Sequence, residues 1–160
     1  MASEQEIYAL IDRYGIYGAL SIIIIKEIDQ NKLTYSPLNL RNRWKILFEG
    51  LKNRPFETSG HWCPCRTLQG LIENEHIKFK PGVVITFKST KPNKNYEYAR
   101  VAIEILTERF HSNWPKDMKE SILWIDVKKY LNITIGYSYQ MHVLKALNEK
   151  DLILGLSKQH

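Results

Sequence analysis

The hydrophobic positions of the first thirty residues repeat with the period of a helix. Four of them follow the i, i+3, i+4, i+7 spacing of an amphipathic helix, namely Ile7, Leu10, Ile11 and Tyr14. Gly15 follows them, as a glycine often does where a helix ends. Residues 16–28 are apolar on nearly every side, a pattern shared by buried strands and buried helices. Because no β-turn residue breaks this run, we expect it to be helical.

A further helix is predicted to begin at Ser36-Pro37, since serine caps helices and proline suits the first helical position. Its apolar positions recur at helical spacing and include Trp44 and Phe48, and the helix ends before Arg54-Pro55. The opposite face carries three cations, Arg41, Arg43 and Lys45. The pattern therefore indicates an amphipathic helix with a basic outer face.

Prolines and glycines punctuate residues 55–94, which marks a change in character. Residues 77–80 and 83–88 each alternate apolar with polar positions, as strands do. Pro81-Gly82 lies between them and is typical of a turn. We therefore expect a β-hairpin whose lysines face solvent, followed by an exposed basic loop at 88–95.

The last third of the chain again favours helices. The expected elements are a helix at 96–110, a short strand at Trp124-Ile125, a helix from Asp126 to Leu131, a turn at 132–136 and a longer helix at 137–149. Together with the earlier elements they predict an α+β fold that is mainly helical. We expect three regions: an N-terminal helical region at 1–54, a basic hairpin region at 55–94 and a C-terminal unit at 95–160.

Residues 123–154 have the layout of a winged helix-turn-helix. A strand-like pair precedes a capped helix, a turn and a second helix, and the stretch ends in residues 147–153, which resemble the L-x-E-K-G-L-I ending of winged-helix proteins. The resemblance covers residues 96–160. It implies that the helix at 137–149 is a recognition helix that enters the major groove of DNA.

The resemblance also implies contact residues. Val143, Leu144 and Leu147 would face the core, which leaves other side chains of this helix to face outward. The candidates for nucleic-acid contact are Tyr137, Ser138, Gln140, His142 and Lys145, together with Lys128 and Lys129 on the preceding helix. Glutamine pairs with adenine, and lysine with guanine or phosphate. Each of these side chains could also be ordinary solvated surface.

Charge is distributed unevenly and strengthens the case for a polyanionic partner. The formal net charge is +6, yet residues 32–100 hold thirteen basic and five acidic side chains, a net charge of +8. Residues 101–160 hold eight basic and seven acidic side chains, a net charge of only +1. Because phosphate neutralisation dominates affinity for nucleic acid, the basic helix with Arg41, Arg43 and Lys45 is a second candidate contact surface.

One short cluster contains metal-ligating residue types. His61, Cys63 and Cys65 lie within five residues, and His76 could be a fourth ligand. The two cysteines are separated by one residue, whereas structural zinc sites space them as C-x₂₋₄-C. We therefore expect no metal and no cofactor, and a loop that packs Trp62.

Composition places the chain among soluble globular proteins. Of its 160 residues, 44% are hydrophobic and 25% are charged. The longest apolar run is about ten residues, short of the ~20 needed to cross a bilayer. The two cysteines fit a reducing compartment, so we expect a cytoplasmic location.

These patterns predict a non-enzymatic protein that binds nucleic acid, with duplex DNA favoured, in a regulatory or replication-accessory role. No phosphate loop, convergent carboxylates or nucleophile triad is evident in the sequence. Such readers commonly bind as dimers, and the apolar run 16–28 could assist pairing or be buried within one chain. The alternative is a small inhibitor or adaptor that covers an acidic protein surface.

Overall fold

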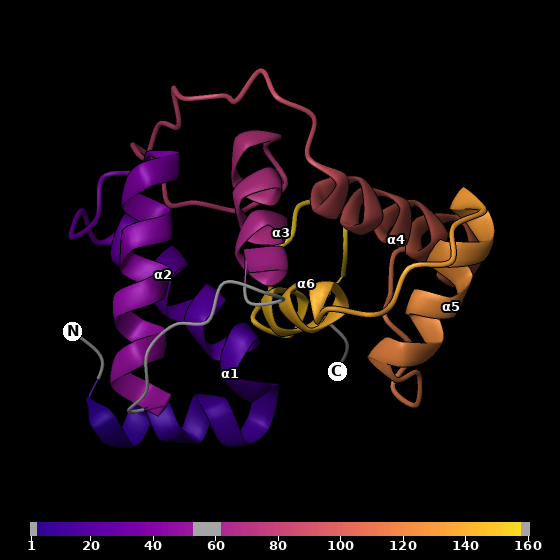
Figure 1. Cartoon of the computed structure of the whole chain (residues 1–160), viewed down its shortest axis with the longest axis horizontal. Helices are drawn as coiled ribbons and strands as arrows, with labels where there is room; N and C mark the ends of the chain where they lie inside the picture. Colours follow the sequence, from indigo (N-terminus) through magenta and orange to yellow (C-terminus); the bar gives the residue numbers. More distant parts are fainter. Residues whose placement is uncertain (1–2, 53–61, 158–160) are drawn as a thin grey trace.

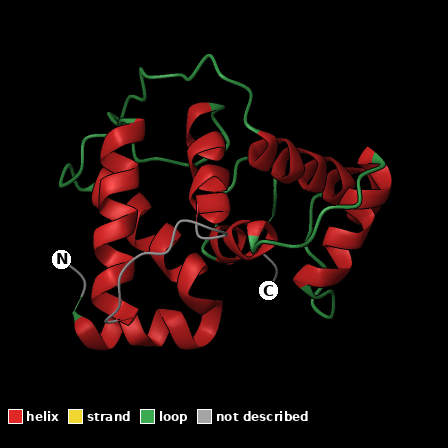
Figure 2. Ribbon diagram, in the orientation of Figure 1, coloured by secondary structure: helices red, strands yellow, loops and turns green. Residues whose placement is uncertain are grey.

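The computed structural model describes residues 3–52 and 62–157, and within these ranges the fold consists of helices and loops without a strand (Figures 1 and 2). The helices are α1 (Glu4–Asp29), α2 (Pro37–Lys52), α3 (Trp62–Glu73), α4 (Lys94–Phe110), α5 (Glu120–Leu131) and α6 (Gln140–Glu149). Two isolated β-bridges join Ile77 to Ile153 and Asn113 to Ser157. The expectation of a mainly helical chain is confirmed, but the predicted α+β class with a hairpin and a winged helix is wrong.

Helix α6 forms the centre of the molecule. It packs against α1, α3, α4 and α5, and seven of its ten residues are buried. Its contact with α1 is close, because a Cβ built on Gly18 would lie 2.8 Å from the Cβ of Ala146. The hydrophobic core extends from Tyr14 to Leu156 and draws on all three of the predicted regions.

Helix α1 is interrupted where the sequence predicts. Gly15 has φ 74° and ψ 171°, a conformation that glycine adopts readily and that bends the helix into two parts. Beyond it, Ile22, Ile24 and Ile25 are fully buried in the core, so these side chains are not free to pair two copies of the chain. By length and composition α1 could cross a membrane, but buried core helices pass the same test, and half of its apolar stretch is buried.

Residues 77–88 do not form the predicted hairpin. The first arm pairs instead with the C-terminal segment, since Lys78 N donates to Leu152 O and Leu154 N donates to His76 O, both at 2.8 Å. The second arm belongs to an arch that runs past the end of α3 to the start of α4 (Figure 1). An alternating pattern carries no information about which segment would pair with it, and among residues 77–88 only Ile77 forms a bridge, with Ile153.

Helix α3 was not predicted, because Pro64 and Gly70 were interpreted as loop residues. Pro64 lies in the first turn, where a missing N–H costs no helical hydrogen bond. Gly70 lies where α4 approaches, and a Cβ there would be 2.2 Å from the Cβ of Tyr96. Both residues are therefore compatible with a helix in this tertiary setting.

The strand expected at Trp124-Ile125 is also absent, since both residues lie within α5. Leu123, Trp124 and Val127 are buried in α5 at the i, i+1, i+4 spacing of a helix. A run of four apolar residues cannot separate a strand from a buried helix by itself. Without this strand and a two-stranded wing, the described chain does not form a winged-helix unit.

Candidate functional site

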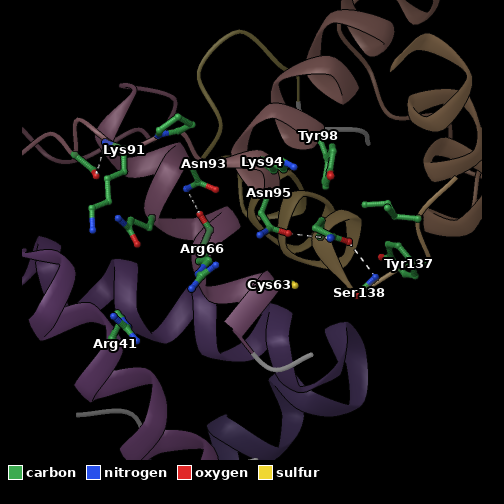
Figure 3. Close-up of a pocket in the computed structure, with 16 residues that line it drawn as sticks. Arg41, Cys63, Arg66, Lys91, Asn93, Lys94, Asn95, Tyr98, Tyr137 and Ser138 are labelled. Atoms are coloured by element: carbon green, nitrogen blue, oxygen red, sulfur yellow. Dashed lines mark hydrogen bonds between the residues drawn. The ribbon is translucent and has the colours of Figure 1, made fainter. Parts of the chain in front are cut away.

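A large cleft of about 820 Å³ opens where α2, α3 and α4 meet the segments that precede α4 and α6 (Figure 3). Its polar lining is made up of Arg41, Arg66, Lys91 and Lys94, with Gln69, Ser89, Asn93, Asn95, Ser138 and Gln140. Cys63, Pro92, Tyr98, Ile135, Gly136 and Tyr137 complete it. We refer to this feature, lined by these residues, as the cationic cleft. Its size is within the ~300–1,000 Å³ range of ligand sites.

Among the described residues, the four cations of the cleft have no acidic partner. No aspartate or glutamate of the described residues lines the cleft, and none lies within ion-pairing distance of Arg41, Arg66, Lys91 or Lys94. Several cations elsewhere are paired, for example Arg43 with Glu27 at 2.6 Å. Positive charge in a concave, low-dielectric site raises the local concentration of anions. The cleft is therefore suited to a negatively charged ligand.

Three helices begin at this cleft, which adds to its positive potential. Cys63 belongs to the first turn of α3, Lys94 and Asn95 to that of α4, and Gln140 to that of α6. The N-terminus of a helix carries a partial positive charge and unpaired backbone N–H groups. These termini reinforce the four side-chain cations in attracting an anion.

Asn93 holds two of the converging helices together. Its Oδ1 accepts a hydrogen bond from Tyr96 N at 3.0 Å, which caps α4, and its Nδ2 donates to the carbonyl oxygen of Arg66 at 2.8 Å. The first bond satisfies an N–H that the helix itself leaves open. The second joins α4 to α3, so one side chain sets the positions of Arg66 and Lys94 relative to each other.

A network of amides forms the floor of the other end of the cleft. Gln140 is only 1% exposed, and its Oε1 accepts from Ser138 N at 3.1 Å while its Nε2 donates to Asn95 Oδ1 at 3.0 Å. Figure 3 shows these bonds between the start of α4 and the segment before α6. A buried amide that is satisfied in this way orients its neighbours.

Beside the cleft, Tyr137 supports the start of α6. Its hydroxyl accepts a hydrogen bond from His142 N at 3.0 Å and also bonds to His142 Nδ1. Burial raises the pKa of Tyr137, so the hydroxyl remains protonated. Burial also lowers the pKa of His142; nearby Glu120 opposes this effect and Lys145 adds to it. This arrangement is structural, because it satisfies backbone groups at a helix end.

His142 and Lys145 line a second, smaller pocket of about 190 Å³ between α1, α5 and α6. Two carboxylates, Glu120 and Glu149, oppose its cations. Lys145 Nζ lies 3.5 Å from Glu120 Oε1. Because the charges balance, this pocket does not favour an anion as the cationic cleft does.

The structure brings four of the ten predicted contact residues together in the cleft: Arg41, Tyr137, Ser138 and Gln140. It separates the other six. His142 and Lys145 line the second pocket, Arg43 is bonded to Glu27, Lys45 lies 3.9 Å from Glu49, and Lys128 and Lys129 lie in the last turn of α5. The structure thus disperses the basic face that the sequence predicts for α2.

The structure does not place the final helix as the exposed recognition helix of a winged-helix unit. Helix α6 is enclosed by four other helices, and Gln140, which was expected to face outward, is buried. A recognition helix must present one face to solvent in order to enter the major groove. The polar face of α6 that holds His142 and Lys145 lines the second pocket, between α1 and α5.

Several residues of the cleft were not predicted as contacts, among them Arg66, Lys91, Asn93, Lys94 and Asn95. The sequence contains one indication of their role. Asn93 three residues before Tyr96 is a typical N-cap, so the end of the basic loop is also the start of a helix. A basic segment at a helix N-terminus favours anion binding.

The candidate metal cluster is only partly described. His61 lies outside the described residues. Cys63 lines the cleft whereas Cys65 is fully buried, and His76 Nε2 lies 2.9 Å from the hydroxyl of Tyr96. Burial raises the pKa of Cys65 to about 12. Cys63, Cys65 and His76 therefore lie in three different environments: the cleft, the core and the contact with Tyr96.

Comparison with known proteins adds a family but no activity. Neither a curated protein nor a solved structure matches the chain. A family model described as a family of unknown function, DUF6979, matches residues 14–154, which include every helix from the second half of α1 to α6. The match spans most of the 160 residues, and the chain belongs to the DUF6979 family.

Proposed function

We propose that this protein is a non-enzymatic nucleic-acid-binding protein that holds phosphates of a strand in the cationic cleft. The observation that carries the proposal is the convergence of Arg41, Arg66, Lys91 and Lys94 on one cleft without an acidic neighbour among the described residues. Phosphate contacts supply most of the affinity of proteins for nucleic acid. A cleft that concentrates cations is suited to those contacts.

The polar groups of the cleft fit this role. Arginine and lysine donate to phosphate oxygens, and asparagine, glutamine and serine commonly contact phosphate or sugar. Arg66 and Lys94 come from the neighbouring helices α3 and α4, an arrangement suited to separate phosphates of one strand. Among the described lining residues there is no histidine or carboxylate to act as a general base, which favours binding over catalysis.

An acidic protein surface is the alternative partner. The concave shape of the cleft and its amide groups favour phosphates, because a flat acidic protein surface would leave a buried recess unfilled. A competition experiment with an acidic peptide distinguishes the two kinds of partner. A polyglutamate peptide should displace nucleic acid only at far higher concentration if the cleft is built for phosphate.

Fluorescence anisotropy with a labelled single strand and a labelled duplex tests the proposal. If four phosphates are neutralised on a single strand, the slope of log affinity against log salt should be about −3, so affinity falls about fiftyfold between 50 and 200 mM salt. A triple variant, Arg66→Gln, Lys91→Gln and Lys94→Gln, should flatten this slope to about −0.7. Its affinity at 50 mM salt should fall by at least tenfold.

The matched control removes the same net charge from another part of the surface. Lys116, Lys128 and Lys129 lie outside the cleft, and a Lys→Gln variant at all three should retain the wild-type slope within error. Equal losses in the two triple variants would overturn the proposal, because the effect would then come from net charge alone. Failure of the wild type to bind either probe at 50 mM salt would also overturn it.

A further inference from the structure

The two ends of the cationic cleft differ in chemistry (Figure 3). Arg41, Arg66 and Lys91 lie at one end, which we call the cationic end, and the fourth cation, Lys94, lies nearer to Tyr98. Tyr98 and Tyr137 lie at the other, where Ile135 also lines the cleft; we call it the aromatic end. A ligand that fills the whole cleft must therefore combine an anionic group, held mainly at the cationic end, with a partly apolar group at the other end.

The aromatic end offers both apolar surface and hydrogen bonds. Ile135 is 44% exposed although it is a large aliphatic side chain, so it presents apolar surface at the rim. The hydroxyl of Tyr98 has no hydrogen-bond partner among the described residues. Asn95 uses its Oδ1 to hold Gln140, and its Nδ2 remains available to a ligand. A planar ring with polar edges matches these groups.

The dimensions of the cleft limit what form of nucleic acid can enter. A volume of about 820 Å³ is that of a small-ligand site. A duplex keeps its bases stacked inside and presents only their edges, in a major groove ~12 Å wide. A base can occupy the aromatic end only if it has left the stack or belongs to an unpaired strand.

We infer that the cleft binds a single unpaired nucleotide of a strand, with its phosphate at the cationic end and its base at the aromatic end. This inference rests on the proposed function and specifies its ligand. It favours single strands and strand ends over continuous duplex, in contrast to the duplex DNA that the sequence favoured. Sequence preference then comes from the fit of one base, with no role for a recognition helix.

Competition against a labelled single strand separates the contributions of the two ends. The competitors are inorganic phosphate, a nucleoside and the corresponding nucleoside 5′-monophosphate. The nucleotide should compete at a concentration at least tenfold below that of inorganic phosphate, because apolar contact with Ile135 and hydrogen bonds to the Tyr98 hydroxyl and Asn95 Nδ2 together add about tenfold or more. The nucleoside, which lacks the anion, should compete least. A blunt duplex probe should bind at least tenfold more weakly than the single strand.

Two variants assign these effects to the two ends. Ile135→Ser should reduce the advantage of nucleotide over phosphate about threefold to tenfold while inhibition by phosphate stays the same. The control is Ile125→Ser on α5, which alters an isoleucine of similar exposure, 43%, outside the cleft, and should change neither value. Arg66→Gln should weaken phosphate and nucleotide alike. Thermal melting of each variant checks that it is folded.

The outcomes distinguish this inference from the proposed function. If single strands bind through the cleft cations but nucleotide competes no better than phosphate, or duplex binds as tightly as single strand, the inference is overturned and the proposed function stands. If neither strand nor nucleotide binds, both are overturned. Full retention of the nucleotide advantage in Ile135→Ser, or an equal loss in Ile125→Ser, would also overturn the inference.

Discussion

The side-chain amide of Asn93 donates to the carbonyl oxygen of Arg66 at 2.8 Å, and this bond joins the start of α4 to the first half of α3. Because Asn93 also caps α4, its replacement should affect stability and binding together. Asn93→Ala should lower the free energy of unfolding by about 1–2 kcal/mol, the usual cost of a lost cap. Urea denaturation measures this change.

Asn93→Asp is the informative companion to the alanine variant. Aspartate retains an oxygen that caps α4 but cannot donate to Arg66, and it places a negative charge in the cleft. We expect a smaller loss of stability than in Asn93→Ala, and a larger loss of affinity for a single strand. Equal affinities in the two variants would contradict a role of the cleft charge.

Gly70 and Gly50 provide a matched test of the packing that forms the cleft. Gly70→Ala should destabilise the protein by about 1–3 kcal/mol or more, because its Cβ would lie 2.2 Å from the Cβ of Tyr96. Nothing lies within 4 Å of a Cβ at Gly50, which is in the last turns of α2, so Gly50→Ala should be neutral or stabilising by about 0.5–1 kcal/mol. Thermal or urea unfolding compares the two. A stable Gly70→Ala protein would show that α3 and α4 are packed less closely than described.

Arg41 and Arg43 are close in sequence but should differ in effect. The guanidinium of Arg43 donates to both carboxylate oxygens of Glu27, at 2.8 and 2.6 Å, and Glu27 is mostly buried. Arg43→Gln should cost about 1.5–3 kcal/mol of stability, typical of hydrogen bonds to charged groups, without changing the salt slope of binding. Arg41→Gln should reduce that slope and cost at most about 1 kcal/mol, the scale of its cation–π contact with Trp62. Urea denaturation measures the stability of both variants, and salt titration measures their binding slope. A reduced slope in Arg43→Gln with an unchanged slope in Arg41→Gln would place the ligand elsewhere on α2.

Two half-buried histidines should make the protein less stable in mild acid. Burial lowers the pKa of His76, with a smaller effect of Arg100 in the same direction, and burial also lowers the pKa of His142. Between these lowered values and the ordinary value of about 6.5, the unfolded chain binds more protons than the folded one. The free energy of unfolding should therefore fall as the pH drops below about 6.5 and level off below the folded pKa values.

Urea denaturation between pH 7.5 and pH 5 measures this dependence. The double variant His76→Gln and His142→Gln should have a smaller decrease over this range than the wild type, whatever its stability at pH 7.5. An unchanged decrease in the double variant would mean that other groups cause the loss of stability in acid.

Much of the fold follows from local pattern, and the exceptions have physical reasons. The helices α1, α2 and α4 are predicted because their apolar stripes, the Gly15 interruption and the Ser36-Pro37 start are all local features. Helix α3 is missed because the need for Gly70 arises from Tyr96, twenty-six residues away along the chain. The run at Trp124 is ambiguous because short apolar runs suit either a strand or a buried helix.

The sequence indicates which segment carries the positive charge of the cleft, but not where in the fold its side chains meet. All four cleft cations lie within residues 32–100, the segment with the excess of positive charge. The tertiary fold decides which of the thirteen basic side chains converge on the cleft. Ion pairs such as Arg43–Glu27 neutralise other cations, so these are not available to a ligand. The burial of α6 likewise depends on neighbours that no local pattern specifies, so its polar residues were assigned to solvent.

Alkylation of Cys63 is the most direct test of the claim that nucleic acid occupies the cationic cleft. Cys63 lines the cleft, whereas Cys65 is fully buried with a raised pKa and provides an internal reference in the same helix. Reaction with iodoacetamide, followed by mass spectrometry of the peptide, gives the rate at each thiol. We predict that a saturating single strand slows modification of Cys63 at least fivefold, and that it does so much less in the Arg66→Gln, Lys91→Gln, Lys94→Gln variant at the same strand concentration. An unchanged rate at Cys63 while the wild type is saturated with strand would place the strand elsewhere and contradict the account.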